Sequence, residues 1–154
     1  SAVRRRHTVG RLVSDNADAL FNDGYSYVGG NPDGDITLVE FSDYRCGYCR
    51  KAHTEVAKML STDGNIRLII KEFPILGDQS VLASRFAMAV KQIAGDEAYK
   101  AMNGPEITKQ LAETKALAEK MRVTGTPTFV LQDEMLRGYL PYDQMMTIVN
   151  GKRS

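Results

Sequence analysis

The sequence carries no excess of charge of either sign and no long apolar run. Its 20 lysine and arginine residues nearly balance 19 aspartate and glutamate residues, so we expect no broad electrostatic attraction to nucleic acid or to an acidic membrane. No stretch approaches the roughly 18 consecutive apolar residues that indicate a membrane span. Internal repeats and low-complexity segments are absent too. What is left is a chain of 154 residues, 43% of them hydrophobic, which is enough for one domain with a substantial core.

Cysteine and histidine are also scarce, with two residues of each. Two cysteines, Cys46 and Cys49, cannot form the disulfide framework of a small secreted domain, and their count does not reveal the compartment. A structural zinc site needs four ligands, and His7 and His53 lack the usual spacing. Haem attachment would require histidine directly after Cys49, where Arg50 stands. A redox pair is the favoured interpretation; a weakly stabilising disulfide and a two-thiolate Cu(I) site remain as alternatives.

The cysteine pair lies between a predicted strand and a predicted helix. Residues 35–42 carry apolar side chains on both faces, which is typical of a central strand. Residues 47–60 then follow a helical period that ends before Gly64. A second strand is predicted over 65–73, so the unit reads strand–helix–strand with parallel pairing. The dithiol is therefore expected at the N-terminus of a helix in an α/β fold.

The remaining elements are predicted from the same periodicities. Residues 29–34 are dense in turn residues and mark the start of the core, whereas 4–7 read as a solvated tail. Further helices are predicted over 10–23, 78–94, 105–122 and 141–149, and further strands over 129–131 and 135–139. In the 78–94 helix, the side expected to be buried carries Leu82, Phe86, Ala89 and Ile93.

The spacing of the two cysteines suits thiol–disulfide exchange. A helix N-terminus can lower a thiol pKa from about 8.5 into the range of roughly 3.5–7.5, and the thiolate is the nucleophile. Cys46, at the very start, is expected to be the more exposed and to attack, while Cys49, one turn in, resolves the mixed disulfide. Gly47 relaxes the turn. Arg45 and Arg50 either add positive charge near the thiolate or are ordinary surface arginines.

Two charged residues interrupt the central strands. Glu40 lies six residues before Cys46 and faces the same side as Ile36 and Leu38. Burial would raise its pKa towards neutrality and let it exchange a proton with Cys49. The alternative is an exposed or salt-bridged glutamate, with Lys71 on the next strand as the partner. Both interpretations are compatible with a Glu40–Lys71 pair beneath the dithiol.

Three motifs in order resemble a known family. They are FSDYRCGYC at 41–49, KEFP at 71–74 and GTPTF at 125–129, and they resemble the DsbA-like branch of the thioredoxin superfamily, close to the DsbG and copper-sensitivity-suppressor proteins. The likeness covers about residues 31–150. It implies an α/β thioredoxin-like fold over 31–154, with a helical insertion at about 74–124 before the cis-proline strand and an N-terminal helical extension at 1–30.

The resemblance also implies roles for individual residues. Cys46 would attack, Cys49 would resolve, Glu40 would be the buried acid of the fold and Lys71 its charged partner.

Four more residues would meet the substrate. Pro127 would be cis, and Thr126 would present its backbone to a bound substrate strand beside Cys46. Gly47 and Tyr48 between the cysteines, with Thr126 before Pro127, look more like the family's isomerases than its strongest oxidant.

The resemblance therefore predicts a thiol–disulfide oxidoreductase, an oxidase or isomerase, that needs no cofactor and acts on unfolded or misbridged exported proteins. It also predicts a periplasmic or cell-envelope location, with no signal peptide in this chain, and a membrane partner that recycles the dithiol. Oligomeric state is left open, with the 10–23 helix as the expected contact of a homodimer. The isomerases of the family use a separate dimerisation domain, for which residues 1–30 are too short. The insert is shorter than usual, which suggests a missing segment near Tyr99–Lys100. The alternative function is a copper-binding module that uses the same two cysteines.

Overall fold

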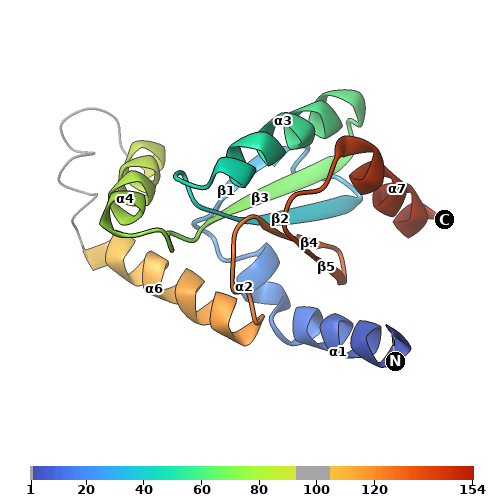
Figure 1. The fold of residues 1–154 in the computed structure, drawn as a ribbon, viewed down its shortest axis with the longest axis horizontal. Coiled ribbons are helices and arrows are strands. Elements are labelled where there is room, and N and C mark those ends of the chain that lie inside the picture. The colour runs from blue at the N-terminus through green and yellow to red at the C-terminus, as the bar shows by residue number, and fades with distance from the viewer. Residues whose placement is uncertain (1, 93–104) are drawn as a thin grey trace.

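The computed structural model describes residues 2–92 and 105–154. Within them, one five-stranded sheet has the order β1-β3-β2-β4-β5 (Figure 1). β2 and β3 pair in parallel, and the other neighbouring strands pair antiparallel. The strands are β1 (Tyr27–Gly30), β2 (Ile36–Ser42), β3 (Ile66–Glu72), β4 (Thr128–Leu131) and β5 (Glu134–Arg137).

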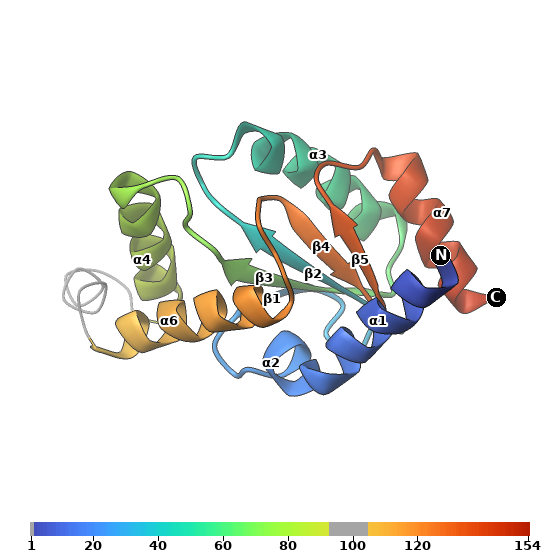
Figure 2. The same cartoon turned by 60° about the horizontal axis from the view of Figure 1, so that its bottom comes forward.

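Helices cover both faces of this sheet, as Figure 2 shows. α3 and α7 lie on one face, and α1, α2 and α6 lie on the other, while α4 packs beside α6. The helices are α1 (Ala2–Asp15), α2 (Ala17–Phe21), α3 (Gly47–Thr62), α4 (Asp78–Gln92), α6 (Pro105–Lys120) and α7 (Tyr142–Arg153). The predicted α/β thioredoxin-like architecture is confirmed, and α4 and α6 stand where the insertion was expected.

The central strand β2 faces a separate apolar core on each side. Leu38 belongs to the core under α3 and α7, whereas Val39 and Phe41 belong to the core under α1, α2 and α6. All three side chains are fully buried. The two-sided apolar pattern of residues 35–42 therefore predicted the centre of the sheet correctly, because only a strand covered on both faces can bury both sets of side chains.

The side of α4 predicted to be buried is only partly so: Ala89 is fully buried as expected, but Leu82 and Phe86 are not. Leu82 and Phe86 are 54% and 59% exposed, whereas Ser84 and Met88 are buried. The helix approaches the sheet through its smaller side chains, and the Ser84 hydroxyl donates to the Glu72 carboxylate at 2.9 Å. That hydrogen bond lets a polar residue be buried at the contact. Ile93 and the Tyr99–Lys100 junction lie outside the described residues.

The N-terminal region holds more structure than the sequence indicated. The helix predicted over 10–23 begins at Ala2 and is broken at Asn16, and residues 4–7 belong to α1, with their side chains exposed. β1 was not predicted at all. Gly30 has φ +65°, and a Cβ there would lie 2.4 Å from the Ile66 oxygen, so the glycine that resembled a turn signal is required at this strand end.

Candidate active site

Cys46 is the N-cap residue of α3. Its Sγ accepts the backbone N–H of Cys49 at 3.2 Å, and its thiol donates to the Thr126 carbonyl at 3.3 Å. Both cysteines are free thiols. Cys46 was expected to be clearly the more exposed, but the two residues are 7% and 5% exposed. The exposed fractions of the two residues are thus similar, and the thiols differ in their acidity.

The two thiols differ in acidity. Burial opposes ionisation of Cys46, but the Cys49 thiol, the Thr126 side chain and the backbone N–H groups of Cys49 and Tyr48 outweigh it, so the pKa of Cys46 is lowered. Burial, together with the neighbouring Cys46 sulfur, raises the pKa of Cys49 to about 11. At neutral pH Cys46 is thus the better nucleophile and leaving group, and Cys49 holds its proton.

The loop before β4 closes the site on the other side. The Thr126–Pro127 peptide bond is cis, which confirms the prediction. The Thr128 hydroxyl donates to the Gly125 carbonyl at 2.7 Å, and the loop leads straight into β4, which pairs with β2. Thr126 is thereby held with its carbonyl against Cys46.

The two residues between the cysteines lie at the surface of α3. Tyr48 is 65% exposed, so its ring is available to a partner. Gly47 has no positive φ, and a Cβ at this position would meet only Arg50 Nη2 at 4.0 Å. The chain would therefore accept a larger residue at Gly47 without a clash.

Glu40 lies on β2 on the face that α3 covers, and it is 4% exposed. Burial raises its pKa to about 7, with a further contribution from the negative charge of Glu72 and an opposing one from the Ser42 hydroxyl. No lysine or arginine in the described part of the chain forms an ion pair with it. A carboxyl group in this state can take or give a proton near neutral pH.

Lys71 does not pair with Glu40, so that expectation was wrong. The parallel register aligns Glu40 with Ile70 and Phe41 with Lys71, which puts the lysine on the opposite face of the sheet. There Lys71 Nζ lies 2.5 Å from Asp23 Oδ2 and 3.2 Å from Ser26 Oγ. Lys71 therefore fastens the segment between α2 and β1 to β3.

No role was predicted for Asp43, which is fully buried. One of its carboxylate oxygens accepts the N–H groups of Ile75 and Leu76 at 2.8 and 3.0 Å, and the other accepts the N–H of Arg45 at 2.9 Å. Arg45 Nη1 adds a bond to the Leu76 carbonyl at 3.2 Å. Asp43 thus ties the cysteine loop to the loop that follows β3. The sequence signal for this role was the aspartate itself, because its side chain can accept the backbone N–H two residues later, as in an Asx turn.

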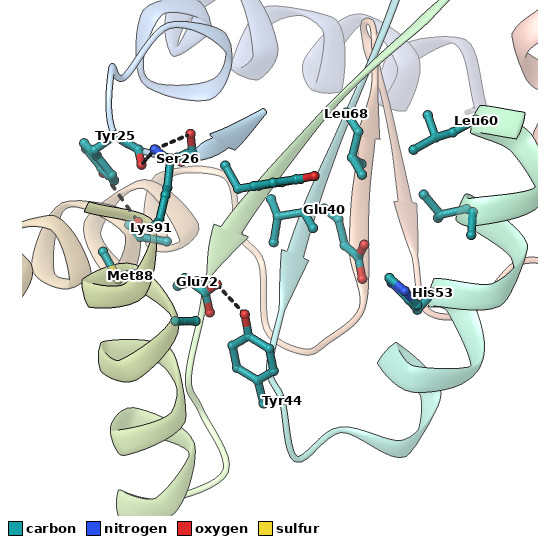
Figure 3. Close-up of a pocket in the computed structure, with 16 residues that line it drawn as sticks. Tyr25, Ser26, Glu40, Tyr44, His53, Leu60, Leu68, Glu72, Met88 and Lys91 are labelled. Atoms are coloured by element: carbon teal, nitrogen blue, oxygen red, sulfur yellow. Dashed lines mark hydrogen bonds between the residues drawn. The ribbon is translucent and has the colours of Figure 1, made fainter. Parts of the chain in front are cut away.

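Glu72 was missed as well. It lines the same cavity as Glu40, His53 and Tyr44, with a volume of about 330 Å³ (Figure 3). Burial raises its pKa to about 7, and the Ser84 and Tyr44 hydroxyls, which donate to it, work against that rise. The available signal was its place in a mostly apolar strand, where it alternates with Lys71.

The described residues contain neither a metal-binding cluster nor a membrane-spanning helix. No group of three or more histidine, cysteine, aspartate or glutamate residues within 2–92 and 105–154 is arranged to hold a metal ion. Over the same residues, no helix combines the length and apolar character required to cross a membrane.

Two family models match the sequence. A model described as thioredoxin matches residues 22–102, and one described as a DSBA-like thioredoxin domain matches residues 84–150. Together they extend from the end of α2 into α7. They include both cysteines and the cis-proline loop.

Several solved structures are similar to this chain. A thioredoxin-like oxidoreductase from Silicibacter pomeroyi is 36% identical, with 90% of this chain and 98% of that one covered and a TM-score of 0.84. The catalytic domain of Proteus mirabilis ScsC is 26% identical, with coverage of 92% and 97% and a TM-score of 0.82. A periplasmic thioredoxin-like protein from Salmonella enterica serovar Typhimurium is also 26% identical, with coverage of 88% and 94% and a TM-score of 0.79.

One curated protein is similar over part of this chain. It is the Na(+)/H(+) antiporter NhaA of Nitrosospira multiformis, 35% identical over 81 residues, which are 52% of this chain. The chain spans only 13% of the length of that protein.

Proposed function

This chain belongs to the DsbA-like branch of the thioredoxin family of oxidoreductases, and we propose that it exchanges disulfides with protein substrates through Cys46 and Cys49. The observation that carries the proposal is the difference between the two thiols. Cys46 has a lowered pKa at the start of α3, and Cys49 one turn later has a raised one. An exchange enzyme needs one sulfur that leaves and attacks easily and one that resolves.

The oxidised site has a Cys46–Cys49 disulfide, and the reaction starts when a substrate thiolate attacks Cys46 Sγ. A mixed disulfide forms, the Cys46–Cys49 bond breaks, and Cys49 leaves as a thiolate that takes a proton from the Glu40 carboxyl group. A second substrate thiolate then attacks the substrate sulfur. The substrate disulfide forms, and Cys46 leaves as a thiolate. Isomerisation uses the reduced form, in which Cys46 attacks a substrate disulfide first.

The substrate we propose is an unfolded or misbridged exported protein. An extended segment would pair with the backbone of Thr126 beside Cys46, which is a form of strand addition. Tyr48 offers an exposed ring on the other side of the sulfur. Recognition of backbone rather than of particular side chains suits an enzyme with many substrates.

A periplasmic or cell-envelope location and recycling by a membrane redox partner belong to the same proposal. The similar protein from Salmonella enterica, which is periplasmic, supports the location. Dimerisation through the 10–23 helix is tested by a solution mass measurement. Val13 and Leu20 from this region are buried against the chain's own sheet, so a dimer would use its outer, polar side.

The test is refolding of a reduced, multi-disulfide protein together with trapping of the mixed disulfide. Wild type accelerates disulfide formation, Cys49→Ala accumulates a mixed disulfide through Cys46, and Cys46→Ala does neither. Catalysis by Cys46→Ala would overturn the proposal. Cu(I) binding that needs both cysteines, with negligible exchange, would favour the copper-binding alternative.

A further inference from the structure

Glu72 and Glu40 are neighbours on one face of the sheet. Glu40 aligns with Ile70, and Ser42 aligns with Glu72, so the two glutamates are diagonal neighbours on adjacent parallel strands. Side chains in this relation lie within reach of one another's charge. Figure 3 shows both carboxyl groups in the same cavity, between α3 and α4.

The two carboxyl groups differ in their hydrogen bonds. Glu72 Oε1 accepts from the Tyr44 hydroxyl at 3.0 Å, and its Oε2 accepts from Ser84 at 2.9 Å. Among the described residues, the Ser42 hydroxyl is the one group that favours the charged form of Glu40. Hydrogen bonds to a carboxylate stabilise the ionised state. When the pair loses its first proton, the charge therefore settles on Glu72, and Glu40 stays protonated.

We propose that Glu72 is a positioning residue for the exchange reaction, because its negative charge keeps on Glu40 the proton that Cys49 takes up. A second charge in a poorly solvated cavity costs more than the first. Glu72 thus extends the pH range in which Glu40 can act as the acid. The inference rests on the proposed function, in which Glu40 serves Cys49.

Other titratable and charged groups face the cavity or Glu72 and define its electrostatics. Lys91 of α4 lines the cavity, but its Nζ donates to the carbonyls of Tyr25 and Ser26 at 2.6 and 3.2 Å, and it forms no ion pair with either glutamate among the described residues. The negative charge of Asp43 raises the pKa of Glu72 in the same sense as burial. The groups are Tyr44 and Asp43 from the cysteine loop, His53 from α3, Lys91 from α4, and Tyr25 and Tyr27 from the segment that includes β1.

The test is an NMR titration of the Glu40 side-chain carboxyl in the reduced protein. Glu72→Gln keeps the size and the acceptor oxygen but removes the charge, so the midpoint of Glu40 should fall by about one unit, the order expected for nearby charges in a protein. The rate at which the oxidised protein oxidises a dithiol should then decline at a correspondingly lower pH. A loss of rate without a shift of the pH profile would mean a structural role only, and an unmoved Glu40 midpoint would overturn the proposal.

Two further variants serve as a weaker perturbation and as a control. Tyr44→Phe removes one donor, so Glu72 ionises less readily and the Glu40 midpoint falls by a smaller amount; this variant also serves if Glu72→Gln does not fold. Glu119→Gln removes an exposed acid from α6 and should change nothing. The Glu40 titration does not depend on catalysis, so a failure of the proposed function in Cys46→Ala remains distinguishable from a failure of this inference.

Discussion

Lys71 and Glu40 sit on adjacent central strands, and both are almost fully buried, yet their surroundings are opposite. Lys71 meets Asp23 Oδ2 at 2.5 Å on the face covered by α1, α2 and α6. Glu40 lies on the other face, where it forms no ion pair with any lysine or arginine of the described residues, and a second acid, Glu72, shares its cavity. The paired charge holds the N-terminal segment against the sheet, whereas the acid without an ion pair can change its protonation state near neutral pH.

The contrast separates buried charge that supports the fold from buried charge that serves chemistry. A paired ion is held in one state by its partner, and losing that partner is costly. An unpaired carboxyl group survives burial by keeping its proton until about pH 7, which is a cost to the fold and an advantage for proton transfer. The following predictions test that division, from the largest expected effect to the smallest.

Removal of Asp23 should have the largest effect on stability. Asp23→Ala leaves Lys71 buried without its partner, so the free energy of unfolding at neutral pH should fall by about 3–5 kcal/mol in urea denaturation. Replacing both members, with Lys71→Met added, should recover most of the loss. Asp15→Ala, at an exposed position of α1, should change stability by less than about 0.5 kcal/mol. Equal effects of the two single variants would contradict the role of the pair.

The stability contributed by the buried acids should change with pH in opposite directions on the two faces of the sheet. Glu40 and Glu72 have folded-state pKa values raised from 4.5 to about 7, so the folded protein binds more protons than the unfolded chain in that window. Stability should therefore decline as pH rises from about 4.5 to 7, by about 3 kcal/mol for each of the two groups. Asp23 has a lowered pKa, so its contribution is present above 3.8 and is lost at lower pH.

Denaturation at a series of pH values measures both the decline in stability between pH 4.5 and 7 and the loss at acid pH. The Glu40→Gln, Glu72→Gln double variant should lose the decline between pH 4.5 and 7 and keep the loss at acid pH. A decline that persists in the double variant would show that other groups cause it.

Glu40→Gln should separate stability from catalysis. At about pH 8 the variant should be more stable than wild type by about 1–2 kcal/mol, because no buried carboxylate forms. Its rate of disulfide exchange should fall by about 100-fold, since the proton donor to Cys49 is gone. Stopped-flow exchange with a small dithiol and urea denaturation give the two values. A stable variant with an unchanged rate would remove Glu40 from the mechanism.

The smallest expected effect concerns Ser84. Ser84→Ala removes one hydrogen bond to the Glu72 carboxylate, so stability should fall by about 1 kcal/mol at pH 8 and by less at pH 5, where Glu72 is protonated. Ser61→Ala, at an exposed position on α3, is the control and should show no such pH dependence. An equal loss at both pH values would mean that the hydroxyl does not interact with the charged form.

Much of the site could be predicted from the sequence because it depends on local patterns. The alternation of β2 placed Glu40 on an inner face, and the change to a helical period placed Cys46 at a helix start. The cis bond before Pro127 followed from the family resemblance, since spacing alone does not determine a peptide isomer.

The features that could not be predicted depend on how secondary-structure elements pair and pack against one another. The β2–β3 register decides which face of the sheet Lys71 shares, and a shift of one residue would reverse it. The helical period of α4 revealed an apolar stripe at Leu82 and Phe86 but not the side that packs, which Ser84 and Glu72 decide together. β1 was not predicted because two of its four residues are glycines, which disfavour strands.

The central claim is that Cys46 is the reactive thiol and Cys49 the one that holds its proton, and alkylation of the reduced protein as a function of pH tests it most directly. With each site followed by mass spectrometry, Cys46 should react first, with a midpoint below the ordinary thiol value of about 8.5. Cys49 should react only at much higher pH, in line with its pKa of about 11. Equal pH dependence at the two sites, or earlier modification of Cys49, would contradict the account.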